Sequence, residues 1–363
     1  MDEIEIAVDS TFHTMEKPWG EDDWKSDTTS LASEIARGRV ENGRRYQSFK
    51  SEEYWTPSDE QQFDAYETGH IVYLLMENSA SNPLHLAPIG KNPKHILDVG
   101  TGKGSWAIDA ADMYPNTVVR GVDLFPPPIN WLPPNCQFEV DDLVREWTWS
   151  MPFDFIFLRH MLGSFDQEGW ATLYKRCYEN LEYGGWIEQF EFDIRVESDD
   201  NSLPEDSLLA KWGETFLGCS NRAGRSLRVQ ETMRDSIEKA GFIDVHEKVY
   251  KVPVGPWPRD MVLKEIGRLN HEHWSTGMEG YAMWLLTKFG APEPWTPEEV
   301  QVYLAHVRAD LKNPKIHGWE YARRVWARKP RKDEIDRQGT PITPEPWLGV
   351  LLERIGELLK WLD

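Results

Sequence analysis

HILDVGTGKGSWAI, the stretch at residues 95–108, decides the fold of this chain. A short apolar run ends at Asp98, glycines follow at Gly100, Gly102 and Gly104, and an apolar helix pattern opens behind them. Glycine is needed where the backbone turns sharply and where a ligand must approach the main chain closely. The stretch therefore predicts a strand, a tight turn and a helix N-terminus on which a nucleotide-like ligand sits.

Strands and helices alternate on both sides of this turn. The patterns predict strands at 95–99, 118–122, 136–140, 153–158, 186–192, about 242–252 and 319–326, and helices at about 104–113, 168–181 and 227–240. Such alternation predicts a doubly wound α/β fold, with a parallel seven-stranded sheet and helices on both faces. Ligands in these sheets bind beyond the carboxyl ends of the strands. Four predicted strand ends point to one crevice: 100–104, Asp123, Asp141 with Asp142, and Arg159.

Composition changes and helix signals divide the chain further. The expected segments are a mobile acidic tail at 1–34, an N-terminal arm and cap at 35–93, the ligand-binding core at 94–258, a helical lid at 259–312, the last strand at 313–328, a linker at 329–346 and an amphipathic helix at 347–363. Asp59 is expected to cap an arm helix from about Glu60 to Met76. The lid, inserted between the last two strands, would cover the crevice. The terminal helix is expected to dock on its own domain, with a homodimer or a protein partner as alternatives.

Charge and length limit the class of protein. The chain has 363 residues and a formal net charge of -21, so nucleic acid and anionic membranes are poor partners for it. The three cysteines are widely spaced and form no CxxC pair, which favours a reducing compartment. The chain shows no signal-peptide pattern and no apolar run near the ~18 residues that span a bilayer. We therefore expect a soluble, cytoplasmic protein, with the nucleus as an alternative.

Three kinds of ligand compete for a glycine-rich first turn. A P-loop requires GxxxxGK[ST], but Leu97 occupies its first glycine position and Gly104 follows Lys103. The dinucleotide fingerprint needs its third glycine where Ser105 stands. The pattern that remains suits a nucleoside without a pyrophosphate, and S-adenosylmethionine (SAM) is such a ligand.

The spacing of the acids supports SAM. Asp123 ends the second strand, where a carboxylate can accept hydrogen bonds from both ribose hydroxyls. Asp142 can accept from an adenine amine while the Leu143 amide faces the ring, and Asp98 can reach the amino end of a methionine moiety. The alternative for each acid is that it caps the next element. The strand-end candidates for cofactor contact are Asp98, Gly100, Thr101, Gly102, Asp123, Leu124, Asp141, Asp142, Leu143 and Arg159.

Several motifs between about residues 40 and 330 resemble one family. They are NGRRY at 42–46, LHLAP at 84–88, the glycine turn with WAID at 106–109, PPNCQFE at 133–139, FDFI at 153–156, LGS at 162–164 and GGWIE at 184–188. Together they resemble fungal class I SAM-dependent methyltransferases similar to the velvet-associated regulator of secondary metabolism. The resemblance implies a methyltransferase sheet, SAM as cofactor and an arm folded over it, with Tyr46 as a contact. Lys103 and His160 depart from the family pattern.

Methyl transfer is an in-line displacement, so the main task of the protein is to place the acceptor and the sulfonium methyl group in line. A general base helps a hydroxyl or acid acceptor, and an amine acceptor does not require one. His160, at the mouth of the crevice, is the first candidate base, because histidine titrates near neutrality. His271 and His273 of the lid come next, followed by Glu188 and Glu191. A packing role is the alternative for each, and the HxH pair lacks a third ligand, so no metal site is predicted.

Three functions stay open at this point. The first is a methyltransferase that acts on an oxygen, nitrogen or carbon of a small molecule, a secondary metabolite. The second is a regulator that keeps the fold and acts through protein partners. The third is a SAM-fold enzyme with non-methyl chemistry such as a cyclisation. Eighteen tryptophans, several of them in the predicted lid, suit either an aromatic substrate pocket or ordinary core packing.

Overall fold

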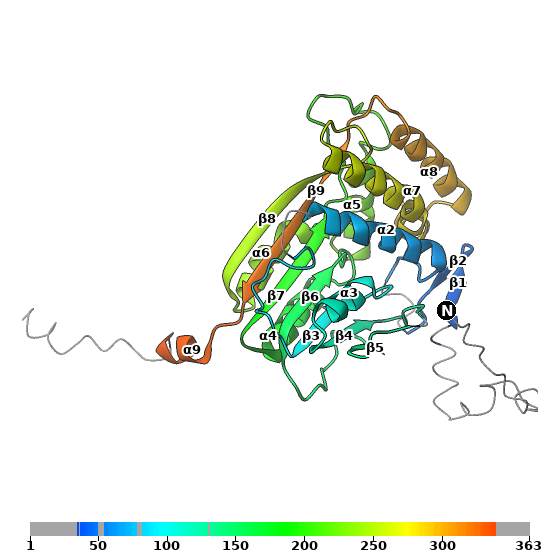
Figure 1. Ribbon diagram of the computed structural model, residues 1–363. Coiled ribbons are helices and arrows are strands. Elements are labelled where there is room, and N and C mark those ends of the chain that lie inside the picture. The colour runs from blue at the N-terminus through cyan, green and yellow to red at the C-terminus, as the bar shows by residue number, and fades with distance from the viewer. Residues whose placement is uncertain (1–34, 36, 50–53, 78–81, 130, 339–363) are drawn as a thin grey trace, which may run out of the picture.

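The computed structural model describes residues 35, 37–49, 54–77, 82–129 and 131–338 (Figure 1). Within them a seven-stranded sheet has the strand order β5-β4-β3-β6-β7-β9-β8. Its strands are β3 (His95–Val99), β4 (Val118–Asp123), β5 (Cys136–Val140), β6 (Phe153–Arg159), β7 (Leu181–Phe192), β8 (Ile243–Pro253) and β9 (Trp319–Arg328). Six of the seven predicted strands are confirmed to within two residues at each end, and β7 begins five residues earlier than predicted, at Leu181.

Helices cover both faces of this sheet (Figure 1). On one face α4 and α6 pack against the strands, and α3 with α2 covers the other. The helices are α2 (Glu60–Met76), α3 (Ser105–Met113), α4 (Gln167–Asn180), α5 (Trp212–Ala223), α6 (Val229–Lys239), α7 (Met261–Phe289), α8 (Pro297–Leu311) and α9 (Lys332–Gln338). The doubly wound α/β fold expected from the alternation of strands and helices is therefore present.

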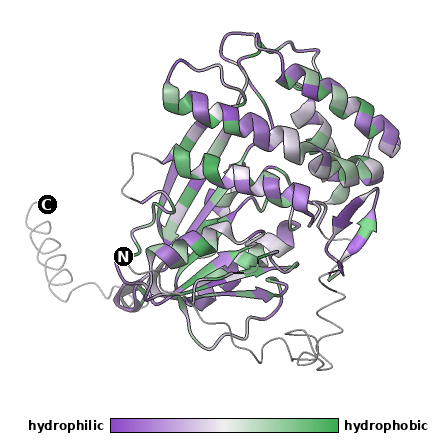
Figure 2. Cartoon of the chain, turned by 45° about the vertical axis from the view of Figure 1, so that its right-hand side comes forward, coloured by the Kyte–Doolittle hydropathy of each residue, from purple (hydrophilic) through white to green (hydrophobic). Residues whose placement is uncertain are grey.

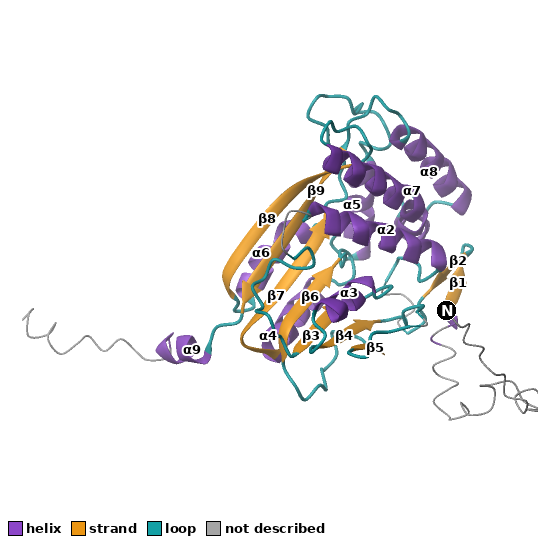
Figure 3. Ribbon diagram, viewed as in Figure 1, coloured by secondary structure: helices purple, strands orange, loops and turns teal. Residues whose placement is uncertain are grey.

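One strand corrects the prediction of a purely parallel sheet. Strand β9 lies between β7 and β8 and runs antiparallel to both. Helices α7 and α8, which connect β8 to β9, both lie at the end of the sheet where β8 finishes (Figure 3). The chain therefore re-enters the sheet from that end, and its last strand must run in the opposite direction.

The strands place alternate side chains in two apolar layers. Leu97, Ile156 and Leu158 belong to the core on one face, and Phe155 and Phe157 to the core on the other. In Figure 2 the strands carry much of the hydrophobic colour, while hydrophilic colour spreads over the outer helices. Strands buried on both faces leave little room for polar side chains.

The segment predicted to be a helical lid, 259–312, contains α7 and α8. Helix α7 is one continuous helix of 29 residues. It packs along α2, and the two helices approach closely at glycines of α7. A Cβ at Gly280 would lie 2.2 Å from Gln62 Oε1, and one at Gly277 would lie 3.2 Å from Ala65 Cβ. These glycines bring the arm helix against the inserted pair.

Three predicted segments lie at the ends of the chain, and the structure describes part of one of them. The predicted tail at 1–34 and terminal helix at 347–363 lie outside the described residues. The segment expected to be a linker, 329–346, contains α9 instead. The Arg328 guanidinium holds this helix through two hydrogen bonds to Glu334, of 2.8 and 3.0 Å. A charged, proline-containing composition suggested a linker, and it cannot reveal a pairing of this kind.

The described part of the arm starts with a hairpin that the sequence did not indicate. Strands β1 (Arg39–Glu41) and β2 (Arg44–Tyr46) form it. Asp59 caps α2, as predicted, because its side chain accepts a hydrogen bond from the Gln62 amide. The same carboxylate accepts two hydrogen bonds from the Arg44 guanidinium, of 2.7 and 2.8 Å, so the cap also fixes the hairpin to the helix.

The start of α8 gives a stability prediction. Thr296 and Glu299 form a capping box, in which Thr296 Oγ1 accepts from the Glu299 amide at 3.2 Å and Glu299 Oε2 from the Thr296 amide at 2.8 Å. We expect Thr296→Ala to lower the free energy of unfolding by about 1 kcal/mol. Urea denaturation measures it, with the exposed Val302→Ala as control. Equal losses in the two variants would mean that the cap adds nothing.

Candidate active site

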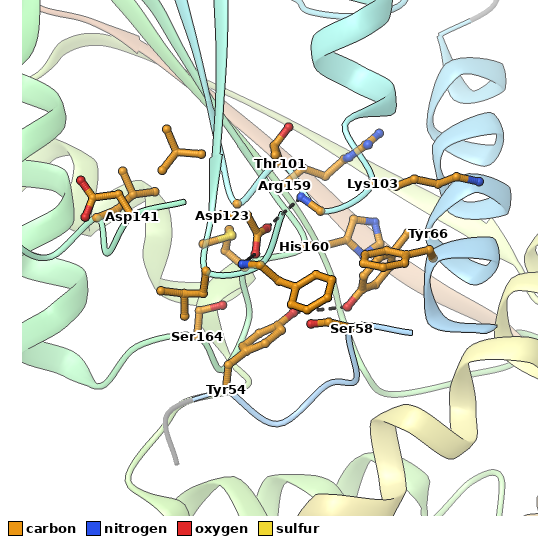
Figure 4. A pocket seen from close by; sticks show the side chains of 18 of the residues that line it. Tyr54, Ser58, Tyr66, Thr101, Lys103, Asp123, Asp141, Arg159, His160 and Ser164 are labelled. Atoms are coloured by element: carbon orange, nitrogen blue, oxygen red, sulfur yellow. Dashed lines mark hydrogen bonds between the residues drawn. The ribbon is translucent and has the colours of Figure 1, made fainter. Parts of the chain in front are cut away.

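A pocket opens where β3, β4, β5 and β6 end (Figure 4). It encloses about 1140 Å³ of empty space, its open mouth included, which is enough for a nucleoside-sized ligand. We call it the first pocket. It is lined by Tyr54, Pro57, Ser58, Phe63, Tyr66, Gly100, Thr101, Gly102, Lys103, Ser105, Val122, Asp123, Leu124, Phe125, Asp141, Asp142, Leu143, Arg159, His160, Met161, Ser164 and Phe165.

The glycine turn forms the floor of the first pocket. The amides of Gly100 and Thr101 both donate to the Val122 carbonyl, which ties the turn to the neighbouring strand. Gly104 has a φ of 89°, and a Cβ there would lie 2.6 Å from the Phe138 ring. At Gly102, by contrast, a Cβ would meet only Tyr66, at 3.7 Å. The backbone at Gly102 is therefore open towards the pocket, where a ligand can approach it.

Asp123 lies in the middle of the first pocket, and Figure 4 shows it among the other wall residues. Its Oδ2 accepts a hydrogen bond from the Gly102 amide at 2.8 Å, and its Oδ1 accepts from the Phe125 amide at 3.3 Å. A carboxylate oxygen can accept more than one hydrogen bond. Burial raises the pKa of Asp123, and the backbone amides oppose this rise. Asp123 therefore orders the turn and keeps acceptor capacity for a ligand.

The other predicted contacts divide into two groups. Leu124, Asp141, Asp142 and Leu143 line the pocket on the β5 side. Asp98 is different, because it is not among the lining residues: it lies behind the turn and accepts a 2.6 Å hydrogen bond from the Thr101 hydroxyl. Burial raises the pKa of Asp98 to about 7. Asp98 can act on a ligand in this pocket only through its neighbours.

Arg159, at the end of β6, lines the first pocket and is held from behind by the arm. Its Nη1 lies 2.8 Å from His70 Nδ1, and its guanidinium stands 4.9 Å from the centre of the Tyr73 ring. Burial lowers the pKa of Arg159 to about 10, and Asp98 and Asp109 oppose this fall. It remains a cation near neutral pH and so offers a positive charge to an anionic part of a ligand.

The arm reaches the pocket through residues that the sequence did not single out. Tyr46 is fully buried beneath the Arg39 guanidinium and does not line the pocket. Tyr54 and Tyr66 line it instead, with their hydroxyls 3.3 Å apart, and Tyr66 also bonds to Thr56 at 2.8 Å. The missed arm residues are Tyr54, Pro57, Ser58, Phe63 and Tyr66. The aromatic content of the arm was a signal for the group, but not for its members.

A second pocket lies against the first. It is lined by Tyr54, Trp55, Thr56, Gln62, Tyr66, His160, Leu162, Phe192, Asp193, Ile194, Trp212, His273, Trp274, Gly277, Met278, Tyr281 and Glu320. It encloses about 760 Å³, and most of its wall is aromatic or aliphatic. Tyr54, Tyr66 and His160 line both pockets. These three side chains therefore form a wall that the two pockets share.

Two of the three predicted histidines meet at this wall. The rings of His160 and His273 lie 6.0 Å apart, and both line the second pocket. His160 has a φ of 54°, a strained value for a residue other than glycine. Burial lowers the pKa of both histidines, so both are neutral near pH 7. His271, two residues away on α7, lines neither pocket and contacts the Leu311 backbone, because neighbours at that spacing lie on different sides of a helix.

Comparison with known proteins identifies the family of this chain. A methyltransferase domain model matches residues 74–247. Methyltransferase pytC of Aspergillus terreus is 36% identical over 296 residues, which cover 81% of this chain and 89% of pytC. Secondary metabolism regulator LAE1 of Cochliobolus heterostrophus is 36% identical over 300 residues, covering 81% of this chain and 95% of LAE1. The chain belongs to this family of SAM-dependent methyltransferases. A solved phosphoethanolamine N-methyltransferase 2 of Haemonchus contortus, in complex with S-adenosylhomocysteine, aligns with a TM-score of 0.42 and 17% identity over 74% of this chain and 57% of that one.

The residues of the first pocket fit the cofactor of such a methyltransferase. Asp123 offers carboxylate oxygens at the end of the second strand of the core, and Gly102 leaves the backbone open beside it. Leu124, Phe125 and Leu143 supply apolar surface of the kind an adenine ring needs. Among the described residues no group of three or more His, Cys, Asp or Glu could hold a metal ion. None of the helices formed by the described residues has the length and apolarity to cross a membrane.

The two glutamates proposed as bases have other surroundings in the methyltransferase. Glu188 lines neither pocket and lies in a buried network with Arg324. Glu191 is fully buried and accepts hydrogen bonds from the amides of Met161, at 2.9 Å, and Leu162, at 3.2 Å. These amides follow directly after His160. Glu191 is therefore a positioning residue that holds the backbone of the shared wall.

The burial of Glu191 predicts a pH effect on stability. Burial raises the pKa of Glu191 to about 7, so between its ordinary value and 7 the folded protein binds a proton that the unfolded chain has lost. Its contribution to stability therefore falls as the pH rises through this window. We expect the stability of Glu191→Gln relative to wild type to increase by up to about 1.4 kcal/mol per pH unit between pH 5 and 7. Urea denaturation across this range measures the change, and a constant difference would contradict it.

Proposed function

We propose that this methyltransferase transfers the methyl group of SAM to a small-molecule acceptor, a secondary metabolite, bound in the second pocket. The observation that carries the proposal is the wall of Tyr54, Tyr66 and His160 that the two pockets share. In-line displacement requires the donor and the acceptor to meet at one point. A shared wall between a nucleoside-sized pocket and an aromatic one supplies such a point.

In this proposal the first pocket holds the cofactor through residues at four strand ends. Asp123 binds the ribose hydroxyls, and Asp142 with the Leu143 amide binds the adenine. Thr101 and Arg159 bind the amino-acid part, where the Arg159 guanidinium suits a carboxylate. Asp98 positions Thr101 through their 2.6 Å hydrogen bond and makes no direct contact.

The second pocket prepares the acceptor. SAM supplies an electrophilic methyl group, and the residues of the pocket exclude water and fix the acceptor beside it. His273 Nδ1 lies 2.7 Å from the Ala65 carbonyl, so it donates its proton there and leaves a lone pair on Nε2. That lone pair can accept a proton from an acceptor hydroxyl or amine, since the lowered pKa of His273 keeps the ring neutral. His160, which lines both pockets, is the other base candidate.

A second function is supported by the similarity to LAE1, whose name describes a regulator of secondary metabolism. In that case the first pocket binds SAM, and the second pocket binds a metabolite signal or a side chain of a protein partner. The protein partner then responds to the bound or methylated state. In this second function the protein acts in the cytoplasm or the nucleus. It forms a homodimer or binds a protein partner through its C-terminal segment. The aromatic second pocket favours the first function.

Calorimetric titration with SAM, followed by a screen for transfer of a labelled methyl group, separates these functions. The proposal predicts saturable SAM binding and label in a small molecule from extracts of the producing organism. Tight SAM binding with label found only in protein would move the assignment to the regulator. No SAM binding by a folded chain would contradict both.

A further inference from the structure

The second pocket combines aromatic walls with a buried acid. Trp212 is central, with its ring 5.4 Å from that of Trp274 and 6.1 Å from that of Tyr281, while Trp55 lies 5.5 Å from Tyr281. These rings come from α5, α7 and the arm. Aromatic faces carry partial negative charge and attract cations, most strongly where water is excluded. The walls therefore suit either a flat apolar ligand or an organic cation.

Glu320, at the start of β9, decides between these two kinds of ligand. Its side chain lines the second pocket and is only 3% exposed. Oε1 accepts hydrogen bonds from Asn270 Nδ2 at 2.8 Å and from Trp274 Nε1 at 3.0 Å. Both donors are neutral, and no Lys, Arg or His among the described residues forms an ion pair with Glu320. Oε2 of Glu320 accepts no hydrogen bond from any of the described residues.

The other charged groups around the second pocket are already compensated. Both oxygens of Asp193 accept hydrogen bonds from Arg195, and Oδ2 also accepts from Gln230 Nε2 at 2.9 Å. His160 and His273 are neutral near pH 7, since burial lowers the pKa of each. Glu320 is thus the one acid of this pocket without a counter-charge among the described residues, and burial raises its pKa to about 8. A cation brought beside it would stabilise its charged form.

We propose that the second pocket binds an organic cation, an ammonium group of the acceptor, between Glu320 and the rings of Trp212, Trp274 and Tyr281. This rests on the proposed function in one respect, that the second pocket is the acceptor site. It narrows the substrate to amine-bearing small molecules. A neutral substrate would leave Glu320 with only its two neutral donors, so nothing would stabilise the charged form of this buried acid. The competing role for Glu320 is only to brace Asn270 and Trp274.

Binding of two matched probes to the full chain, saturated with S-adenosylhomocysteine, tests this proposal. Phenethylamine carries an ammonium group at pH 7, and 2-phenylethanol has the same shape without the charge. We expect the amine to bind at least about tenfold more tightly in calorimetry, from ion pairing and cation–π attraction in a desolvated site. Equal affinities, or no binding of the amine, would overturn the proposal. This comparison requires no variant of the protein.

Glu320→Gln locates the cation. The amide keeps a carbonyl for Asn270 and Trp274, so we expect binding of S-adenosylhomocysteine and of 2-phenylethanol to stay unchanged while binding of phenethylamine falls about tenfold. Asp199→Asn is the charge-matched control, because Asp199 is exposed and pairs with Lys251 outside the pocket. A bracing role alone would weaken both probes equally. If the wild-type protein does not bind S-adenosylhomocysteine, the proposed function is contradicted. If it binds S-adenosylhomocysteine but does not bind phenethylamine more tightly than 2-phenylethanol, only this inference is contradicted.

Discussion

Asp123→Ala is expected to weaken SAM binding by about 100-fold or more, which corresponds to about 3 kcal/mol. The proposed ribose site gives Asp123 two charge-assisted hydrogen bonds, one to each hydroxyl, each worth about 1.5 kcal/mol or more. The same carboxylate accepts from the Gly102 amide at 2.8 Å, so its loss also loosens the turn beneath the ligand. Both effects reduce affinity.

Calorimetric titration of the variant with SAM measures this loss. Asp112→Ala, an exposed acid on α3, is the matched control and should bind SAM as the wild type does. Thermal unfolding without ligand confirms that the variant folds. If a folded Asp123→Ala variant binds SAM with unchanged affinity, the ribose lies elsewhere.

Arg324→Ala is expected to lower the free energy of unfolding by about 3–5 kcal/mol, because it leaves buried carboxylates without their cation. Arg324 Nε lies 2.6 Å from Glu188 Oε1, and both side chains are fully buried. Its guanidinium also donates to Glu77 Oε1 at 3.2 Å and to the Leu84 carbonyl at 3.2 Å. Glu188 in turn accepts from the amides of Leu86 and Ala87, so the arm, the 84–87 loop and the sheet share one network.

Arg323→Ala provides the control for this prediction. Arg323 directly precedes Arg324 on β9, and its guanidinium pairs at the surface with Glu247 at 2.9 Å. Surface pairs of this kind contribute about 1 kcal/mol or less. Urea denaturation of the two variants should therefore separate them clearly. Similar losses would show that the buried network contributes no more than a surface pair.

The sequence predicted the first pocket well, for a topological reason. Asp123, Asp142 and Arg159 end three different strands, and parallel strands in one sheet bring their carboxyl ends to one edge. Residue type and strand position were therefore sufficient to assemble them. Asp98 also ends its strand region, but its side chain points behind the turn to Thr101, which strand position alone does not reveal.

The second pocket could not be predicted in the same way. Glu320 of β9 and Asn270 of α7 meet across 50 residues, and Gln62 of α2 lies against Gly280 of α7. These contacts depend on how α7 packs against β9 and α2. Tyr46 and Tyr54 belong to the same aromatic arm, but Tyr46 is buried in the core while Tyr54 lines both pockets. His271 and His273 differ only in the side of α7 that they occupy. Tertiary packing decides each of these cases.

A crystal structure of the full chain with S-adenosylhomocysteine would show whether the first pocket is the cofactor site and the second pocket adjoins the reacting atoms. We expect the ribose hydroxyls on Asp123, the adenine beside Leu143 and Asp142, and the sulfur facing the wall of Tyr54, Tyr66 and His160, towards the second pocket. A ribose bound away from Asp123, or a sulfur directed away from that wall, would contradict this expectation.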